Sequence, residues 1–322
     1  MPGPTIPTRD ALGTELWPAL PLDQWKDTCD TLHMWTQIVG KVRTALSAPI
    51  NHWWHSTLYV SARGLTTSPI PYGSRVFEVE FDFVHHNLVI RSSDGALKSV
   101  PLFPRSVADF YQEFMSTLRS MTIEVKIWTM PQEFPDPIPF DQDRQHAAYD
   151  TRYVQRFWRI LLTLDGVFKR FRGNFVGKCS PVHFFWGSFD LAVTRFSGRR
   201  APERAGADPV TREAYSHECS SVGWWPGGGP AQDAAFYAYV APAPDGYAEA
   251  RIEPAGAFFS TQFGEFILGY EHVRTALLPE EMLMAFLHTT YEAAANLAHW
   301  DREDLERSEA EKIALGRLRE TA

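Results

Sequence analysis

The chain has 322 residues, of which 44% are hydrophobic and 14% aromatic, and this composition allows a substantial buried core. Its 39 acidic residues outnumber its 31 basic residues, and no run of Lys or Arg resembles the basic stripe that neutralises nucleic-acid phosphates. The first residues lack the basic and apolar regions of a signal peptide, and no stretch approaches the roughly 20 apolar residues of a membrane span. We therefore expect neither nucleic acid nor membrane as a partner.

Three cysteines, Cys29, Cys179 and Cys219, lie far apart in the sequence and form no Cys-x-x-Cys pair. This spacing favours neither a disulfide framework nor a zinc-finger module. A reducing compartment fits such cysteine usage best, so we expect a cytoplasmic protein.

The first half of the chain alternates between helical and strand-like patterns. Apolar residues recur every three to four positions over 21–46, which predicts an amphipathic helix. Ser106, with Asp109 three residues on, resembles a capping box and predicts a second helix up to Leu118. Alternation of apolar and polar residues predicts strands over 52–63, 75–83, 86–91, 97–102 and 123–127.

The second half repeats this order after a proline-rich stretch at 130–140, which reads as a linker. Helices are predicted over 157–171 and 279–299, the second beginning with a proline where a missing N–H is harmless. The residues after Trp300 are dense in both charge signs and indicate a solvated helix or a frayed end. Strands are predicted over 183–196, 214–224 and 235–240.

These patterns predict an α+β fold with antiparallel sheets and long packed helices. The order helix, strands, helix occurs twice along the chain, and the run HWWHSTLYVSARG can be aligned with the run HFFWGSFDLAVTRFSG. An internal duplication is therefore one hypothesis. Ordinary α+β topology produces the same order without duplication. The expected layout is an N-terminal extension (1–20), a first α+β half (21–129), a proline-rich linker (130–146), a second α+β half (147–300) and a charged tail (301–322).

Standard catalytic and nucleotide-binding motifs are absent from the sequence, including G-x-G-x-x-G, the P-loop, H-E-x-x-H and G-x-S-x-G. A nucleotide cofactor is therefore not expected. A first polar set consists of His55, Tyr59 and Arg63 on one predicted strand. If that strand pairs with the next, these side chains share a face with Glu78, Glu80 and Asp82. General acid–base chemistry could use this face, but a solvated sheet with cross-strand ion pairs is the preferred interpretation.

A second polar set follows the strands of the second half: Cys179, His183, Asp190, Arg195, His217, Glu218 and Cys219. His217 and Cys219 would project from one face of a strand, so a thiolate–imidazole metal site made with Cys179 and His183 is geometrically allowed. Free cysteine is, however, more often a small buried hydrophobe. Without a metal, the catalytic candidates are His183, His217, Glu218, Asp190 and Arg195, the arginine orienting a carboxylate or phosphate on the ligand.

The run SSVGWWPGGGP, at 220–230, contains three consecutive glycines between two prolines, which would let the backbone approach a ligand closely. Trp224 and Trp225 could form the walls of such a site, although a plain turn between strands would look the same. The candidate ligand contacts are Trp186, Trp224, Trp225, His55, Tyr59 and Arg63.

Five runs, HMWTQIVGKVR, NHWWHSTLYVSARGLTTSPIPYG, FEVEFDF, VGKCSPVHFFWGSFDLAVTRFSGRRAP and REAYSHECSSVGWWPGGG, resemble an uncharacterised bacterial family of the domain-of-unknown-function type, DUF 5996. The resemblance covers about residues 20–300. It implies a single bacterial cytoplasmic protein and carries no activity, substrate or catalytic residue.

Three functional hypotheses remain open. The first is an enzyme that acts on a small molecule by histidine and carboxylate acid–base chemistry in an aromatic-lined pocket. The second is a non-catalytic protein that binds a small-molecule ligand in the same pocket. The third is a metal- or haem-dependent oxidoreductase, prompted by the His-rich strands and the duplicated layout. We expect the working pocket in the second half, because Phe184, Phe185 and the neighbouring tryptophans give its polar residues an apolar surround.

Overall fold

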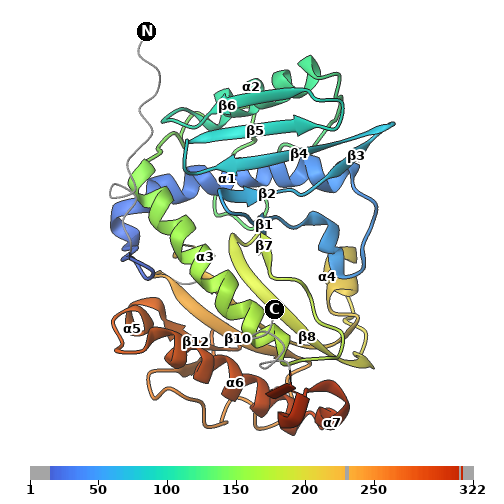
Figure 1. Cartoon of the computed structure of the whole chain (residues 1–322), viewed down its shortest axis with the longest axis vertical. Helices are drawn as coiled ribbons and strands as arrows, with labels where there is room; N and C mark the ends of the chain where they lie inside the picture. The colour runs from blue at the N-terminus through green and yellow to red at the C-terminus, as the bar shows by residue number, and fades with distance from the viewer. Residues whose placement is uncertain (1–14, 229–231, 312, 315–322) are drawn as a thin grey trace.

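The computed structural model describes residues 15–228, 232–311 and 313–314, and it confirms the α+β class. Two antiparallel sheets follow one another along the long axis of the molecule, each with long helices on one face (Figure 1). None of the helices within the described ranges is both long and apolar enough to cross a membrane.

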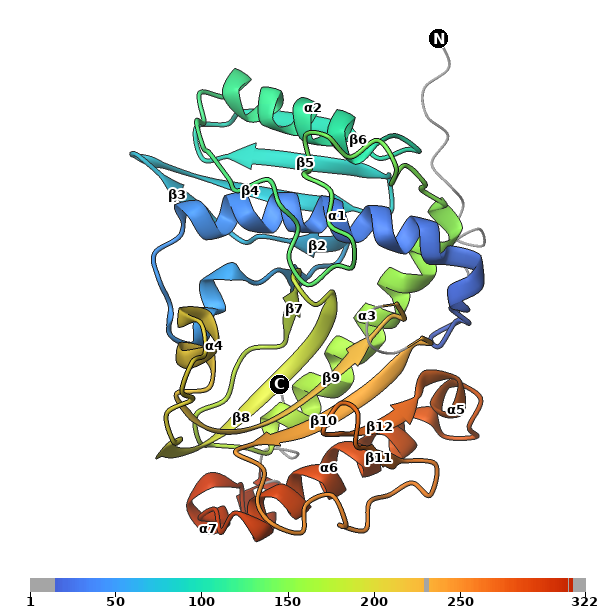
Figure 2. The same cartoon turned by 180° about the vertical axis from the view of Figure 1, so that it is seen from behind.

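The first sheet has the strand order β1-β2-β4-β5-β6, with β3 paired to β4. Its helices α1 and α2 pack on one face, where the side chains of Phe77, Val79 and Phe81 are buried (Figures 1 and 2). The helix predicted from the capping box is confirmed, since the Ser106 hydroxyl accepts the Asp109 N–H at 3.1 Å. The elements are α1 (Leu22–Leu46), β1 (Tyr59–Val60), β2 (Gly64–Thr66), β3 (Ile70–Tyr72), β4 (Arg75–Asp82), β5 (Asn87–Ser92), β6 (Leu97–Pro101) and α2 (Val107–Ser120).

The second sheet has the order β11-β12-β10-β9-β8-β7. Helices α3 and α6 cover one of its faces, and Figure 2 shows the opposite face toward the viewer. Strands β11 and β12 are not anticipated by the sequence patterns. The elements are α3 (Thr151–Gly173), β7 (His183–Phe185), β8 (Asp190–Arg200), α4 (Pro209–Ala214), β9 (His217–Trp225), β10 (Ala235–Ala241), β11 (Phe258–Ser260), β12 (Glu265–Gly269), α5 (Tyr270–Arg274), α6 (Pro279–Leu297) and α7 (Arg302–Leu305).

Backbone hydrogen bonds and the packing of buried side chains join the two halves of the molecule. The N–H and C=O groups of Leu58, just before β1, pair with those of Phe184 on β7 at 2.8 and 2.9 Å. Trp25 of α1 packs against Phe157 of α3 with ring centroids 5.5 Å apart. One continuous cluster of buried apolar side chains includes residues from both halves. The halves therefore share a single core.

The strand predicted over 52–63 is wrong for its first part, which is the 3₁₀ segment η2 (Asn51–Ser56). The hydroxyls of Ser56 and Thr57 donate to carbonyls three residues back, at 2.7 and 3.1 Å, and these local bonds replace strand pairing. His52 adopts a positive φ of 59° inside this turn, whereas His183 begins a strand. The two histidines thus occupy different structures, and the internal duplication is not confirmed.

The segment 123–127, predicted as a strand, has no regular structure. Its flanking backbone is held by side chains, because Tyr72 accepts the Glu124 N–H at 2.8 Å and Arg75 donates to the Met121 carbonyl at 2.6 Å. Further along, the proline-rich stretch packs on α1. Gln37 exchanges two hydrogen bonds with the Gln132 backbone, at 2.8 and 2.9 Å. This stretch is thereby fixed over the face of the second sheet that helices α3 and α6 leave open.

Candidate functional site

A cavity of about 1100 Å³ lies on the face of the second sheet opposite to α3 and α6. Its floor is formed by alternate residues of β8, β9 and β10, and its walls by η2, α4 and the segment 126–133. The alternation of a strand explains this division, since Asp190, Ala192 and Thr194 face the cavity while Leu191 and Val193 are in the core. The volume is slightly above the range of about 300 to 1,000 Å³ that is usual for small-molecule sites.

Asp190 is the most buried carboxyl of this cavity, with 3% of its surface exposed. Its two oxygens accept hydrogen bonds from the hydroxyls of Ser188 and Tyr237. Burial raises the pKa of Asp190 to about 6, with the negative charge of Glu133 acting in the same direction and the two hydrogen bonds opposing. Asp190 can therefore change protonation state near neutral pH.

Tyr237 reaches Asp190 because a glycine lies beneath its ring. Gly223 of β9 is the register partner of Tyr237, and a Cβ at Gly223 would overlap the tyrosine ring. The Tyr237 ring also stacks on Trp225, with centroids 4.3 Å apart. The tyrosine is thus held from both sides, which fixes its hydroxyl at the carboxyl of Asp190.

Glu265 and Glu133 bring two further carboxyls to the same cavity. Burial raises the pKa of Glu265 to about 7, and the charge of Asp190 adds to this effect. Oε2 of Glu265 is buried and has no hydrogen-bond partner among the described residues. Burial also raises the pKa of Glu133. At a pH between 6 and 7, Asp190 is mostly ionised while Glu265 is mostly protonated, so a base and an acid face one space.

The walls of the cavity are largely aromatic. The indole of Trp186 donates to the Ser56 carbonyl and lies against α1 at Gly40, where a Cβ would overlap it. Trp128 is 66% exposed at the edge of the cavity, over the ammonium group of Lys41. Burial lowers the pKa of Lys41 to about 8, and its ammonium donates to the carbonyls of Trp128 and Met130. The aromatic lining comprises Trp53, Trp54, Trp128, Phe185, Trp186, Phe196, Tyr215, Trp225, Tyr237 and Tyr239.

The candidate histidines lie outside the cavity lining. His183 is fully buried beside Trp54 and Tyr59, and neither ring nitrogen has a hydrogen-bond partner among the described residues. Burial lowers the pKa of His183 to about 3, so the ring is neutral. His217 begins β9, where its Nδ1 lies 3.0 Å from the Ser216 hydroxyl.

The other catalytic candidates separate from one another. Glu218 accepts hydrogen bonds from Ser197 at 2.9 Å and from Arg199 at 2.8 Å, and does not line the cavity. Arg195 points to the opposite face of the sheet, between Phe171 and Tyr291. Of the five catalytic candidates, only Asp190 lines this cavity.

The four candidate metal ligands do not converge. Among the residues with described positions, no group of three or more His, Cys, Asp or Glu side chains could hold a metal ion. The metal site predicted from Cys179, His183, His217 and Cys219 is therefore wrong.

The first polar set is an ion-paired sheet face. Arg63 donates to Asp82 at 2.8 Å, and Arg91 donates to Glu80 at 2.9 Å. His55 and Tyr59 do not join them, because His55 lies in η2 and Tyr59 lies under the guanidinium of Arg43. Within the tryptophan pair, Trp225 lines the cavity and Trp224 is fully buried on the opposite face. Gly229 and Pro230, at the end of the glycine-rich run, lie outside the described residues.

The sequence patterns did not predict most of the residues that line this cavity. Glu133 lies in the stretch predicted to be a linker, and Glu265 follows a turn whose strands are only three and five residues long. The alternation of Tyr237 and Tyr239 on a predicted strand was the one signal for that side of the floor.

The model of the family of unknown function DUF5996 matches residues 17–307. No curated protein and no solved structure matches the chain.

Proposed function

Because the chain belongs to DUF5996, a family of unknown function, we propose from the site itself that it is an enzyme that transfers protons on a small, uncharged or cationic ring-bearing molecule. The observation that carries this proposal is a pair of carboxyls that line one aromatic-lined cavity, Asp190 with a pKa of about 6 and Glu265 with a pKa of about 7. Two carboxyls with raised and separated pKa values are the arrangement that acid–base catalysis uses.

Each group would have a defined role. Asp190, oriented by Tyr237 and Ser188, would accept a proton from the substrate, and Glu265 would donate one from its otherwise unpartnered Oε2. Aromatic rings favour the flat faces of a ring or a cationic group. Four carboxyls line the cavity, Glu133, Asp190, Asp208 and Glu265, against the two lysines Lys41 and Lys126, and this excess of acidic groups disfavours an anionic substrate.

Turnover should follow a bell-shaped pH dependence. The rate should rise as Asp190 ionises near pH 6 and fall as Glu265 loses its proton near pH 7. A profile that is flat between pH 5 and pH 8, measured as kcat/KM of an identified substrate, would contradict these roles.

A metabolite screen can identify the substrate. Purified protein is incubated with a mixture of small metabolites, and mass spectrometry follows which compounds disappear. The wild type should consume a compound that Asp190→Asn leaves intact, while Glu218→Gln, which alters a carboxyl outside the cavity, should behave as the wild type. Equal consumption by Asp190→Asn would exclude Asp190 as the base.

The second candidate function is ligand binding without turnover, favoured by the extent of the aromatic lining. The same incubation distinguishes it, because a binder would retain a compound through gel filtration without converting it. Replacement of Trp225 by Ala should then release that compound, since Trp225 forms part of the wall and supports Tyr237.

We also propose a cytoplasmic location. All three cysteines are free, which suits a reducing compartment. Cell fractionation with an antibody to the protein tests this, and recovery in an oxidising compartment would contradict it.

A further inference from the structure

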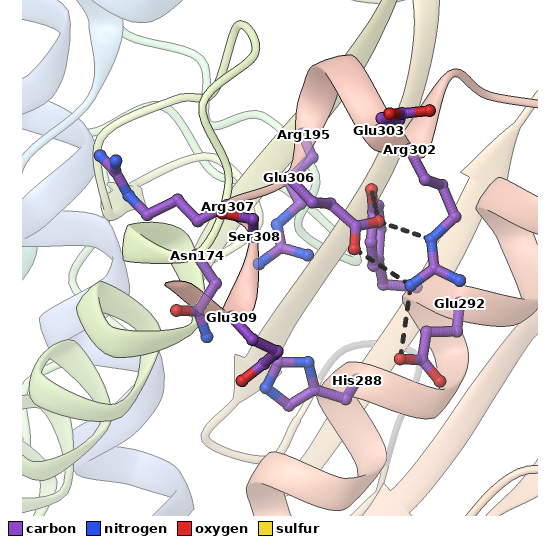
Figure 3. A pocket seen from close by; sticks show the side chains of 11 residues that line it. Asn174, Arg195, His288, Glu292, Arg302, Glu303, Glu306, Arg307, Ser308 and Glu309 are labelled. Carbon is purple, nitrogen blue, oxygen red and sulfur yellow. Dashed lines mark hydrogen bonds and ion pairs between the residues drawn. The ribbon is translucent and has the colours of Figure 1, made fainter. Parts of the chain in front are cut away.

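A second cavity, of about 500 Å³, lies on the other face of β8, between α3, α6 and the segment around α7 (Figure 3). The two cavities are separated by this strand, because Thr194 and Phe196 face the first and Arg195 faces the second. Figure 3 shows the guanidinium of Arg195 pointing into the space between Asn174, His288 and Glu306.

Arg195 is a buried cation without an ion-paired carboxylate in the described part of the chain. It is 2% exposed, and its guanidinium carbon lies 3.5 Å from the ring centroid of Phe171 and 4.3 Å from that of Tyr291. One terminal nitrogen donates to the Phe171 carbonyl, and Nε has no partner within the described residues. Burial lowers the pKa of Arg195 to about 10, which leaves the group charged at neutral pH.

Four glutamates, Glu292, Glu303, Glu306 and Glu309, line the cavity, and two of them are held by another arginine. Glu306 accepts from Arg302 at 2.6 Å and from the Tyr291 hydroxyl at 2.9 Å, and Glu292 lies 3.5 Å from Arg302. Figure 3 shows these contacts on one side of the cavity. The charge of Glu306 acts on Arg195 electrostatically, but no ion pair joins the guanidinium to a carboxylate of the described residues. Buried charges in proteins are normally paired directly, so the side of the guanidinium that faces the cavity offers a site to an anion that binds against the repulsion of the glutamates in the lining.

We propose that this second cavity binds a small oxyanion, the carboxylate or phosphate group of a ligand, through the guanidinium of Arg195. The planar fork of arginine donors matches the oxygens of either group. The proposal is independent of the acid–base function, since the two cavities lie on opposite faces of the sheet.

The test is thermal unfolding of the full-length protein in acetate or in inorganic phosphate, with ionic strength held constant by sodium chloride. The midpoint temperature of the wild type should rise and saturate with one of the two anions, and the anion that acts distinguishes carboxylate from phosphate. Because phosphate also stabilises proteins non-specifically, specific binding is judged from the difference between the wild type and the variants.

Arg195→Met should lose the saturable rise. It should still fold, because it removes a buried charge that has no ion pair among the described residues. Arg199→Met is the matched control, since Arg199 is on the same strand outside both cavities and pairs with Glu218 at 2.7 Å. That control should respond as the wild type does.

Two further variants keep the test decisive if Arg195→Met unfolds. Asn174→Asp places a negative charge across the cavity and should weaken anion binding by at least about tenfold, whereas Glu306→Gln removes one and should strengthen it several-fold. The proposal is overturned if neither anion gives a saturable rise in the wild type, or if Asn174→Asp and Glu306→Gln leave the rise unchanged.

Discussion

The side-chain carboxyl of Asp190 is buried in the folded protein, so the binding of a proton to it is coupled to folding. Its pKa of about 6 in the fold is higher than the 3.8 of an unperturbed aspartate. The folded state therefore holds this proton more tightly than the unfolded state does. The resulting stabilisation is fully present below pH 3.8 and is lost as the pH rises through 6.

We predict that Asp190→Asn lacks this contribution to the pH dependence of stability. Between pH 4 and pH 7 the free energy of unfolding of the wild type, relative to the variant, should fall by about 2 kcal/mol. Urea unfolding at a series of pH values measures the difference. Parallel curves for the two proteins would show that Asp190 has an ordinary pKa.

His183, a catalytic candidate in the sequence, is buried, and neither of its ring nitrogens has a hydrogen-bond partner among the described residues. Replacement by Leu removes its two buried nitrogens, so stability should be unchanged or higher by about 1 to 2 kcal/mol. The matched control is His33→Leu, since Nε2 of His33 donates to the Gly187 carbonyl at 2.8 Å. That variant should lose about 1 to 3 kcal/mol. Denaturant unfolding compares them, and a larger loss at His183 would contradict this account.

At the level of elements, strand β9 shows how a small residue shapes the first cavity. Gly223→Ala should displace Tyr237 from Asp190 and destabilise the protein by about 1 to 3 kcal/mol, because its Cβ overlaps the tyrosine ring. Gly269→Ala, on the same sheet with open space around its Cβ, should change stability little. Unfolding free energies give the comparison, and equal values for both variants would refute the role of Gly223.

Local patterns predicted the elements that depend on local physics. The helix α1 and the strand β4 followed from apolar periodicity, although α1 is buried on all sides from Thr31 to Arg43 and β4 on both faces at its end. The strand predicted from His52 failed because Ser56 and Thr57 turn the chain with their own hydroxyls. The cavity was not predicted from the sequence, for a different reason. Glu133, Asp190 and Glu265 come from three distant segments, and only the packing of the proline-rich stretch on α1 brings the first of them to the sheet.

At the level of the whole molecule, the shared core has a consequence for unfolding. Trp25 and Leu58 connect the two halves through Phe157 and Phe184. We expect one cooperative thermal transition, with equal calorimetric and van't Hoff enthalpies. Two resolved transitions in scanning calorimetry would mean that the halves fold separately.

The most direct test of the central claim is a carboxyl titration by carbon-13 NMR in the ligand-free protein. Two side-chain carboxyls should titrate near pH 6 and pH 7, the first absent in Asp190→Asn and the second absent in Glu265→Gln. Glu218→Gln should retain both. If every carboxyl instead titrates below about pH 5, the cavity holds no acid–base pair poised near neutral pH and the proposed function is wrong.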